Sequence, residues 1–200
     1  MDPVAHTLVG AALAETGLKR ASRYATACLL IGANLADVDA LAHLGGDDTA
    51  LYLRRGLTHG VLALVALPLL LTAGLWLWHR WRGARADDSS PPFRPGAILA
   101  LSFLAVWTHP LLDWLNTYGV RLLMPFDQRW FYGDTLFIID PWVWLLAAAG
   151  VLLARSHGRL ALTGWIVLAA LTSALVLVTD RAPLAVKLGW LAGVALLAVL

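Results

Sequence analysis

Two long apolar segments constrain the fold of this chain more than any other feature. Gly60–Trp78 and Leu160–Val178 carry no charged side chain, and a helix of about 20 apolar residues crosses the hydrocarbon core of a bilayer. Hydrophobic residues make up 60% of the 200 residues and charged residues only 14%, against about a quarter in soluble domains. This composition excludes a disordered chain and disfavours a soluble domain. We therefore expect an all-α fold, a polytopic membrane helical bundle.

Three further apolar segments bring the expected number of spans to about five. They are Gly96–Leu115, Phe137–Ala154 and Leu184–Leu200. Tyr24–Ala36 is apolar but only about 13 residues long, so we interpret it as a buried or re-entrant helix. We find no internal repeat and no second soluble domain, which predicts a single membrane domain over residues 1–200.

The basic residues of the loops predict the orientation in the membrane. Four arginines lie in the loop His79–Pro95 (Arg80, Arg82, Arg85 and Arg94), and Arg155–Arg159 adds two more. Loops dense in Lys and Arg face the cytoplasm, so the opposite face would be periplasmic in a bacterial inner membrane. We place Lys19, Arg20 and Arg23 on that opposite face, where their charge argues against this orientation.

Ionisable residues beside the spans are gathered in five short segments. Such residues are costly in a membrane and mark functional sites. The predicted topology puts all five segments at one membrane face, and packing alone does not explain three His and several Asp gathered there. His and carboxylate ligands without Cys suit Zn²⁺, Mn²⁺ or Mg²⁺. The five segments are Ala5–Thr7, Asn34–His43, Arg54–His59, His109–Asp113 and Gly133–Pro141.

His109 and Asp113 form the sharpest pair among these residues. A spacing of four places both side chains on one helix face, within reach of one metal ion. The alternative is a His–Asp pair that fills a polar gap between helices. Pro110 lies between them and would kink the helix or start a new one.

The other candidates each have a structural alternative. Of Asp37 and Asp39, one would bind the metal while the other orients a ligand or caps a helix. His59 is either a metal ligand or an interfacial residue at a helix start. Arg55 is either a bidentate clamp for phosphate or an anchor that reaches the interface. Asp140 precedes a proline, as helix N-caps do.

Several other classes of protein are excluded. The chain has no nucleophile elbow, no phosphate-binding loop and no His-Glu-x-x-His motif. Its single cysteine, Cys28, rules out an internal disulfide and a Cys-rich zinc module, and we expect it to be buried in an apolar environment. The basic residues are not gathered on one polar face, so we expect no nucleic-acid partner.

The polar motifs, taken in order, resemble the YdjM family of bacterial inner-membrane metal-dependent hydrolases. The resemblance covers about residues 1–155, with residues 156–200 as additional transmembrane helices. The family is in turn distantly similar to the all-helical fold of zinc-dependent phospholipase C and fungal nucleases, in which His and Asp side chains hold zinc ions. The motifs are His6-Thr7, Asp37–Asp39, Arg55–His59, His109–Gly119, Pro125-Phe126 and Gly133–Pro141.

The resemblance implies roles for individual residues. His109 and Asp113 match the family's helical His-x-x-x-Asp pair, Asp37 or Asp39 matches a bridging aspartate, and His59 and His6 match histidine ligands. Two departures stand out. The soluble enzymes use the α-amino group of a processed N-terminal Trp, where this chain has Met1, and their second His-rich helix is replaced here by Asp134–Asp140.

The resulting hypothesis is a membrane-embedded, metal-dependent hydrolase of phosphoesters in lipids or lipid-linked substrates. It would hold two or three divalent ions, with zinc favoured and manganese or magnesium as alternatives, and its partners would be the bilayer and a lipid phosphoester. The alternative is a non-catalytic scaffold or an ion-handling protein with a structural metal site. The predicted metal ligands are His6, Asp37, His59, His109, Asp113 and Asp140. The predicted catalytic residues are Asp39, Arg55 and Asp134.

Overall fold

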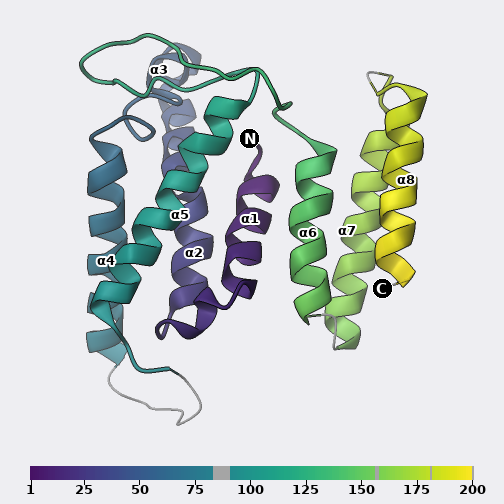
Figure 1. Ribbon diagram of the computed structural model, residues 1–200. Helices are drawn as coiled ribbons and strands as arrows, with labels where there is room; N and C mark the ends of the chain where they lie inside the picture. The colour runs from purple at the N-terminus through teal and green to yellow at the C-terminus, as the bar shows by residue number, and fades with distance from the viewer. Residues whose placement is uncertain (83–90, 156–157, 181, 200) are drawn as a thin grey trace. The chain divides into compact units, whose positions relative to one another are not determined.

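The structure is a computed structural model that describes residues 1–82, 91–155, 158–180 and 182–199. In these ranges every regular element is a helix (Figure 1), which confirms the predicted helical membrane bundle. The α-helices are α1 (Pro3–Glu15), α2 (Ala25–Asn34), α3 (Asp47–Leu53), α4 (Ala63–Arg82), α5 (Pro95–Leu115), α6 (Pro141–Arg155), α7 (Arg159–Val178) and α8 (Leu184–Val199). Two 3₁₀ helices, η1 (Leu18–Arg20) and η2 (Leu35–Gly45), flank α2.

Four described helical segments are long and apolar enough to cross a membrane. They are Ala25–Gly45, Ala63–Arg82, Pro95–Leu115 and Arg159–Val178. The first corrects our interpretation of Tyr24–Ala36 as too short, because α2 continues directly into η2 and the segment reaches 21 residues. The helical winding continues past the two aspartates of η2. The helices Pro141–Ala154 and Leu184–Val199 are apolar but shorter.

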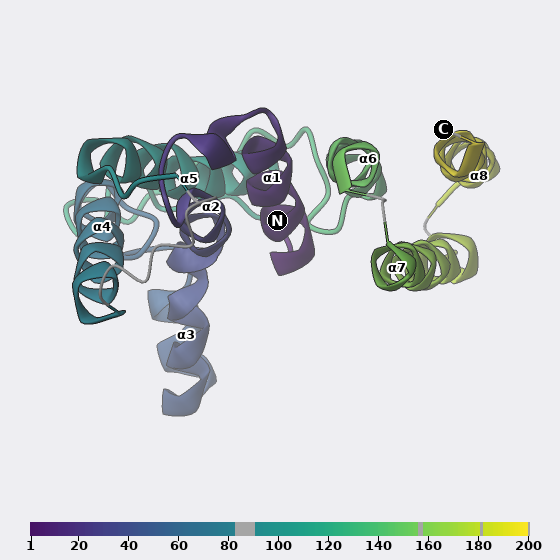
Figure 2. The ribbon, with the colours of Figure 1, turned by 90° about the horizontal axis from the view of Figure 1, so that it is seen from below.

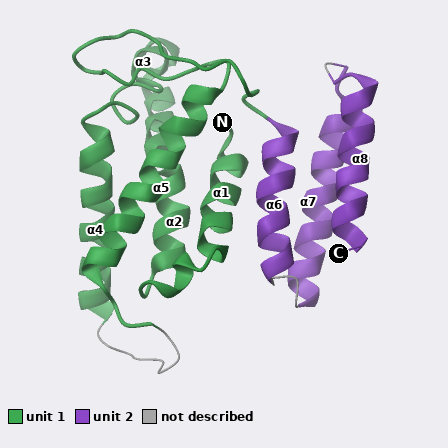
Figure 3. Ribbon diagram, viewed as in Figure 1, with its two compact units in different colours: residues 1–139 green, residues 140–200 purple. Residues whose placement is uncertain are grey.

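The chain divides into two compact units, Met1–Ile139 and Asp140–Leu200 (Figure 3). Helix α6 belongs to the second unit because it packs with α7 and α8. In this second unit, α8 approaches α6 through Gly189, which faces Trp142, and Gly193, which faces Leu145. Small residues allow such close helix packing inside membranes.

The first unit is built on α2, which contacts α1, α4 and α5 (Figure 2). Gly32 of α2 lies so close to α5 that a Cβ there would be 2.6 Å from the Cβ of Ala105. Cys28 is fully buried at the same interface, as expected. Its Sγ lies 3.2 Å from the Ser102 hydroxyl, which accepts a hydrogen bond from Thr72 of α4. These contacts fix the relative positions of the helices that carry the polar motifs.

The turn between α1 and α2 lies against Pro92 and Arg94, which are at the end of the first unit where α5 begins. The Arg23 N–H donates to the carbonyl of Pro92, and the Arg94 N–H donates to the Ser22 hydroxyl. Our assignment of Lys19, Arg20 and Arg23 to the opposite face was therefore wrong. The physical reason is that α1 and α2 form an antiparallel hairpin (Figure 1), so η1 is one helix length away from the polar motifs. Arg85 lies outside the described residues.

At the other end, the segment between α5 and α6 runs across the first unit (Figure 1). Isolated bridges join Asn116 to Leu136 and Val120 to Phe131. The buried guanidinium of Arg121 donates to backbone carbonyls at the end of α3, including that of Arg54 at 2.8 Å. The segment is thereby attached to the turn that leads from α3 to α4.

Candidate metal centre

Four side chains from separate parts of the first unit converge at this end. Asp37, His59, His109 and Asp113 each offer one ligand atom, and these atoms all lie within 4.8 Å of one another. Asp37 comes from η2, His59 from the turn before α4, and the other two from α5. Helix α5 continues through Pro110, so His109 and Asp113 lie one turn apart, as predicted. The two histidines and Asp113 are fully buried, whereas the Asp37 side chain is 19% exposed.

The distances in this group are those of ligands that share one ion. The Asp113 Oδ2 atom lies 3.2 Å from His59 Nε2 and 3.4 Å from His109 Nε2. His109 Nε2 lies 3.6 Å from Asp37 Oδ1. Two ligands of a tetrahedral zinc ion, each about 2 Å from the metal, are separated by about 3.3 Å. The group therefore matches the size of a single divalent ion.

Three of the four ligand atoms also lack a conventional partner. His59 Nε2, His109 Nε2 and Asp113 Oδ2 are buried and make no hydrogen bond within the described residues. Buried polar atoms are almost always hydrogen-bonded, because an unpaired one keeps its full desolvation cost. A cation at the point where these atoms converge would satisfy all three, so the donor set fits a metal.

The opposite ring nitrogens of the two histidines are held by the protein. His109 Nδ1 lies 2.6 Å from the carbonyl of Ala33, which directs the Nε2 lone pair into the group. His59 Nδ1 lies 3.3 Å from Asp39 Oδ2. This carboxylate oxygen also accepts from the Arg55 N–H at 2.7 Å and from the Thr58 hydroxyl at 3.1 Å. Asp39 is thus placed to orient His59.

His6 borders the group from α1. Asp2 caps this helix by accepting from the N–H groups of Val4 and Ala5, and it fixes the register that turns His6 inward. The His6 ring stacks on His109 with centroids 3.7 Å apart, and its Nε2 lies 3.4 Å from Asp113 Oδ1.

His6 and His59 lie outside the membrane-spanning segments, and burial keeps both in the neutral form that binds metals. It lowers the pKa of His6 to about 2 and also lowers the pKa of His59, so both rings are neutral. A neutral imidazole has a free lone pair, whereas a protonated one has none.

The Asp113 carboxylate also forms an ion pair with the α-amino group of Met1, a contact that the sequence motifs did not predict.

Arg55 is the cationic side chain nearest to the group. Its guanidinium is buried, and its Nη2 lies 3.1 Å from Asp113 Oδ1. Its Nη1 donates to Asn116 Oδ1 and to the carbonyl of Gly119. Its charged carbon also lies 4.7 Å from the centre of the Tyr118 ring.

Five of the nine predicted residues are not members of the four-residue group; His6, Asp39 and Arg55 contact its members, and the remaining two are Asp134 and Asp140. Asp134 is exposed in the segment between α5 and α6, at a positive φ of 50°. Asp140 belongs to the second unit, where its carboxylate accepts from the N–H groups of Trp142 and Val143 and caps α6. The N-cap alternative therefore describes its observed contacts. The catalytic role of Asp134 and the ligand role of Asp140 stay predictions.

Sequence reasoning gave no role to two polar residues that support the group. Thr58 donates to Asp39, and its hydroxyl lies 3.0 Å from His59 Nδ1. Asn116 donates to Asp113 Oδ1 at 3.3 Å, while its own Oδ1 accepts from the N–H groups of Tyr118 and Gly119. Both residues lie inside the quoted motifs, so the available signal was their closeness in sequence to a predicted ligand.

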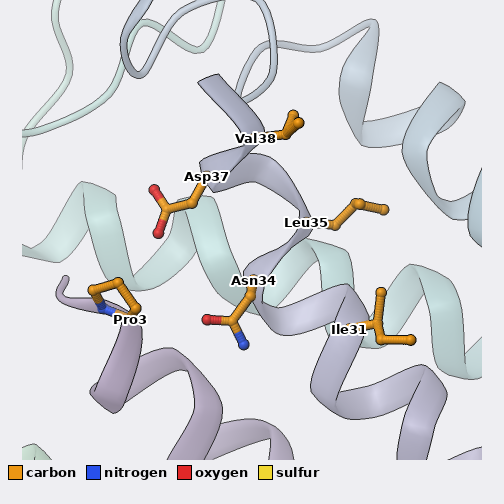
Figure 4. Close-up of a pocket in the computed structure, with 6 residues that line it drawn as sticks. All are labelled: Pro3, Ile31, Asn34, Leu35, Asp37 and Val38. Carbon is orange, nitrogen blue, oxygen red and sulfur yellow. The ribbon is translucent and has the colours of Figure 1, made fainter. Parts of the chain in front are cut away.

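A cavity of about 360 Å³ lies beside Asp37 (Figure 4). In this view the side chains of Asp37 and Asn34 point toward Pro3 of α1, whereas the apolar side chains point to the other side of the helix. The cavity borders both the partly exposed member of the group and apolar residues of α2 and η2. Its lining residues are Pro3, Ile31, Asn34, Leu35, Asp37 and Val38.

Comparison with known proteins places the chain in a family. The family model described as YdjM inner membrane protein matches residues 1–182. The chain is also similar to a curated Bacillus subtilis (strain 168) protein described as "Uncharacterized protein YfhP", with 24% identity over 176 residues. That match covers 82% of this chain and 49% of the relative, so the chain spans about half of the relative's length. No solved structure matches.

The family match includes all of the first unit and most of the second. It agrees with the four apolar helical segments, which make the chain a multi-pass membrane protein. It also confirms the resemblance drawn from the order of the polar motifs. The chain belongs to the family of YdjM inner membrane proteins.

Proposed function

We propose that the chain is a metal-dependent hydrolase of phosphoesters carried by lipids or lipid-linked molecules. The observation that carries the proposal is the convergence of three unpaired, buried ligand atoms next to a ligand that is open to a cavity. A closed structural metal site has all its ligands supplied by the protein, whereas a catalytic site keeps one side accessible. The group already supplies four ligands, so water or substrate would add a fifth on the side where Asp37 reaches the cavity.

The donor set favours zinc. Two neutral imidazoles and two carboxylates are common zinc ligands, and manganese or magnesium would rely more on the carboxylates. The four-residue group has the ligands of one ion. The second or third ion implied by the resemblance would need ligands beyond this group, and His6, whose ring stacks on His109, is the candidate beside it. Elemental analysis of the purified protein would give the number of bound ions per chain.

The chemistry follows from the ligands and their supports. A divalent ion in this group would polarise a phosphoryl oxygen and acidify a water molecule. Asp37 and Asp113 would supply the negative charge that holds the ion, and His59 and His109 would keep fixed orientations through Asp39 and Ala33. Because Asp39 Oδ2 faces His59 Nδ1, we assign Asp39 the orienting role and keep Asp134 as the candidate general base.

The lipid character of the substrate is inferred from the cavity. The segment Ala25–Gly45 is long and apolar enough to cross a membrane, and Ile31 and Val38, which line the cavity, are each nearly half exposed. On such a helix these side chains face acyl chains. A molecule with an apolar chain and a phosphate group would match both parts of the cavity.

The charges of the first unit support a periplasmic site. At the end opposite the candidate metal centre lie six basic residues, namely Lys19, Arg20, Arg23, Arg80, Arg82 and Arg94. Two of the arginines near the metal centre, Arg55 and Arg121, are buried and engaged by protein groups. By the positive-inside rule we expect the basic end to face the cytoplasm and the candidate site to face the periplasm.

Purified protein in detergent would test the proposal with two readouts. Metal content is measured first, and hydrolysis is then followed on a panel of phospholipids and prenyl phosphates. We expect His109→Ala to lose both the bound metal and the hydrolysis. The exposed His43 provides a matched control, because His43→Ala removes a histidine outside the group. Tightly bound metal without hydrolysis of any panel member would instead favour a scaffold or ion-handling protein.

A further inference from the structure

Arg55 makes more contacts to the candidate metal centre than its expected role as a phosphate clamp would require. We propose that Arg55 is a positioning residue, which holds Asp113 so that its Oδ2 atom faces the metal ligands while its Oδ1 atom is capped by the guanidinium. This inference rests on the proposed metal centre and is independent of hydrolysis. It gives the arginine of the Arg-Gly-x-Thr-His motif a role toward the metal rather than the substrate.

The guanidinium of Arg55 already has acceptors within the protein. The Arg55 side chain is only 3% exposed, and Nη2 is directed at Asp113 Oδ1. Nη1 donates to Asn116 Oδ1 at 3.1 Å and to the Gly119 carbonyl at 3.2 Å. A bidentate phosphate clamp needs two neighbouring guanidinium donors directed at the ligand, and of the three guanidinium nitrogens only Nε makes no hydrogen bond within the described residues. Here both Nη groups are directed at protein oxygens.

The Arg55 backbone contacts the other side of the candidate metal centre. Its N–H donates to Asp39 Oδ2 at 2.7 Å, the same oxygen that faces His59 Nδ1. Its carbonyl accepts from the Arg121 N–H at 2.8 Å. One residue therefore contacts both carboxylates that orient the group, Asp39 through the main chain and Asp113 through the side chain.

The backbone conformation of Arg55 is also unusual. Arg55 has a φ of 51°, in the left-handed region that residues other than glycine seldom adopt. Such a conformation persists where surrounding contacts over-determine it, and it clusters at functional sites. The hydrogen bonds on both sides of Arg55 provide these contacts.

The test uses cobalt(II) as a spectroscopic substitute for zinc. Visible absorption of the cobalt protein reports how the ligands are arranged, and competition with a chelator gives the affinity. In Arg55→Met the side chain keeps its bulk but loses its charge and donors, so Asp113 Oδ1 loses its guanidinium partner and keeps only Asn116 and the Met1 α-amino group. We expect an altered cobalt spectrum and an affinity about 10- to 100-fold weaker, as for other residues that orient metal ligands. Arg55→Lys should restore part of the affinity.

Two further variants separate positioning from folding. Arg129 is 72% exposed and pairs with Asp127, so Arg129→Met is a matched control that should keep the wild-type spectrum. If Arg55→Met does not fold, as judged by circular dichroism, Asn116→Ala replaces it in the test. Asn116→Ala removes the acceptor of Nη1 and a direct bond to Asp113, and it should change the spectrum in the same direction.

The same measurements on Arg55→Met can also contradict the inference. A wild-type cobalt spectrum and affinity in Arg55→Met, together with weaker binding of inorganic phosphate, would overturn the inference and favour the clamp. Absence of hydrolysis by the wild-type protein would count against the proposed function alone, because the cobalt readout needs no turnover.

Discussion

The contact between Asp39 and His59 provides the sharpest quantitative prediction. Asp39→Asn keeps the size of the side chain but removes its negative charge. The Asp39 Oδ2 atom now serves the Arg55 N–H, the Thr58 hydroxyl and His59 Nδ1 at 2.7, 3.1 and 3.3 Å. A neutral amide oxygen would accept these donors more weakly, since charge-assisted hydrogen bonds are about twice as strong as neutral ones.

The magnitude follows from the role of Asp39 as a support rather than a ligand. Replacing a carboxylate that orients a metal-bound histidine lowers metal affinity by about 10- to 100-fold. This range corresponds to about 1.4–2.7 kcal/mol, because each tenfold change is about 1.36 kcal/mol. Asp37→Asn alters a member of the group itself, so it should lower the affinity further.

The assay is a competition titration of zinc against a chromophoric chelator, with the protein in detergent. Asp47→Asn is the matched control, because Asp47 is exposed on α3 and should leave the affinity unchanged. A wild-type affinity in Asp39→Asn would refute the reasoning. A loss as large as that of Asp37→Asn would also refute it, since Asp39 would then be a ligand itself.

Three further predictions concern packing, protonation and the cavity. Gly32→Ala places a Cβ 2.6 Å from the facing alanine of α5, so the free energy of unfolding should fall by about 1–3 kcal/mol; Gly74→Ala has open space and should be neutral or stabilising. Folding lowers the pKa values of His6 and His59 below the ordinary value of about 6.5. Below about pH 6.5 the unfolded chain therefore binds more protons than the folded one, so the thermal stability of the metal-free protein should fall as the pH drops. Tryptophan fluorescence during heating measures both effects, and a flat profile between pH 7 and 5 would contradict the second. If the cavity binds an acyl chain, Ile31→Trp should slow hydrolysis of a long-chain lipid phosphoester more than that of a short soluble one; equal slowing would argue against it.

The sequence by itself determined the class of fold and most of the metal-binding group. Apolar segments such as Gly60–Trp78 indicate membrane spans, because their length matches the bilayer and they carry no charge. The pair His109 and Asp113 was predictable because helical periodicity alone brings residues four apart together. Asp37 and His59 were identified because ionisable residues beside spans are costly, so a cluster of them indicates a site.

Only the tertiary structure decided which carboxylate faces which histidine. The spacing of Asp37 and Asp39 allowed either to be the ligand, and packing of η2 against α5 and the turn before α4 directed Asp37 to His109 and Asp39 to His59. The path of the chain likewise decided that the α1–α2 turn lies beside Pro92 and Arg94, because α1 and α2 run in opposite directions and return the chain to the end that carries the polar motifs. Local pattern cannot specify these features, since they depend on contacts between residues far apart in the sequence.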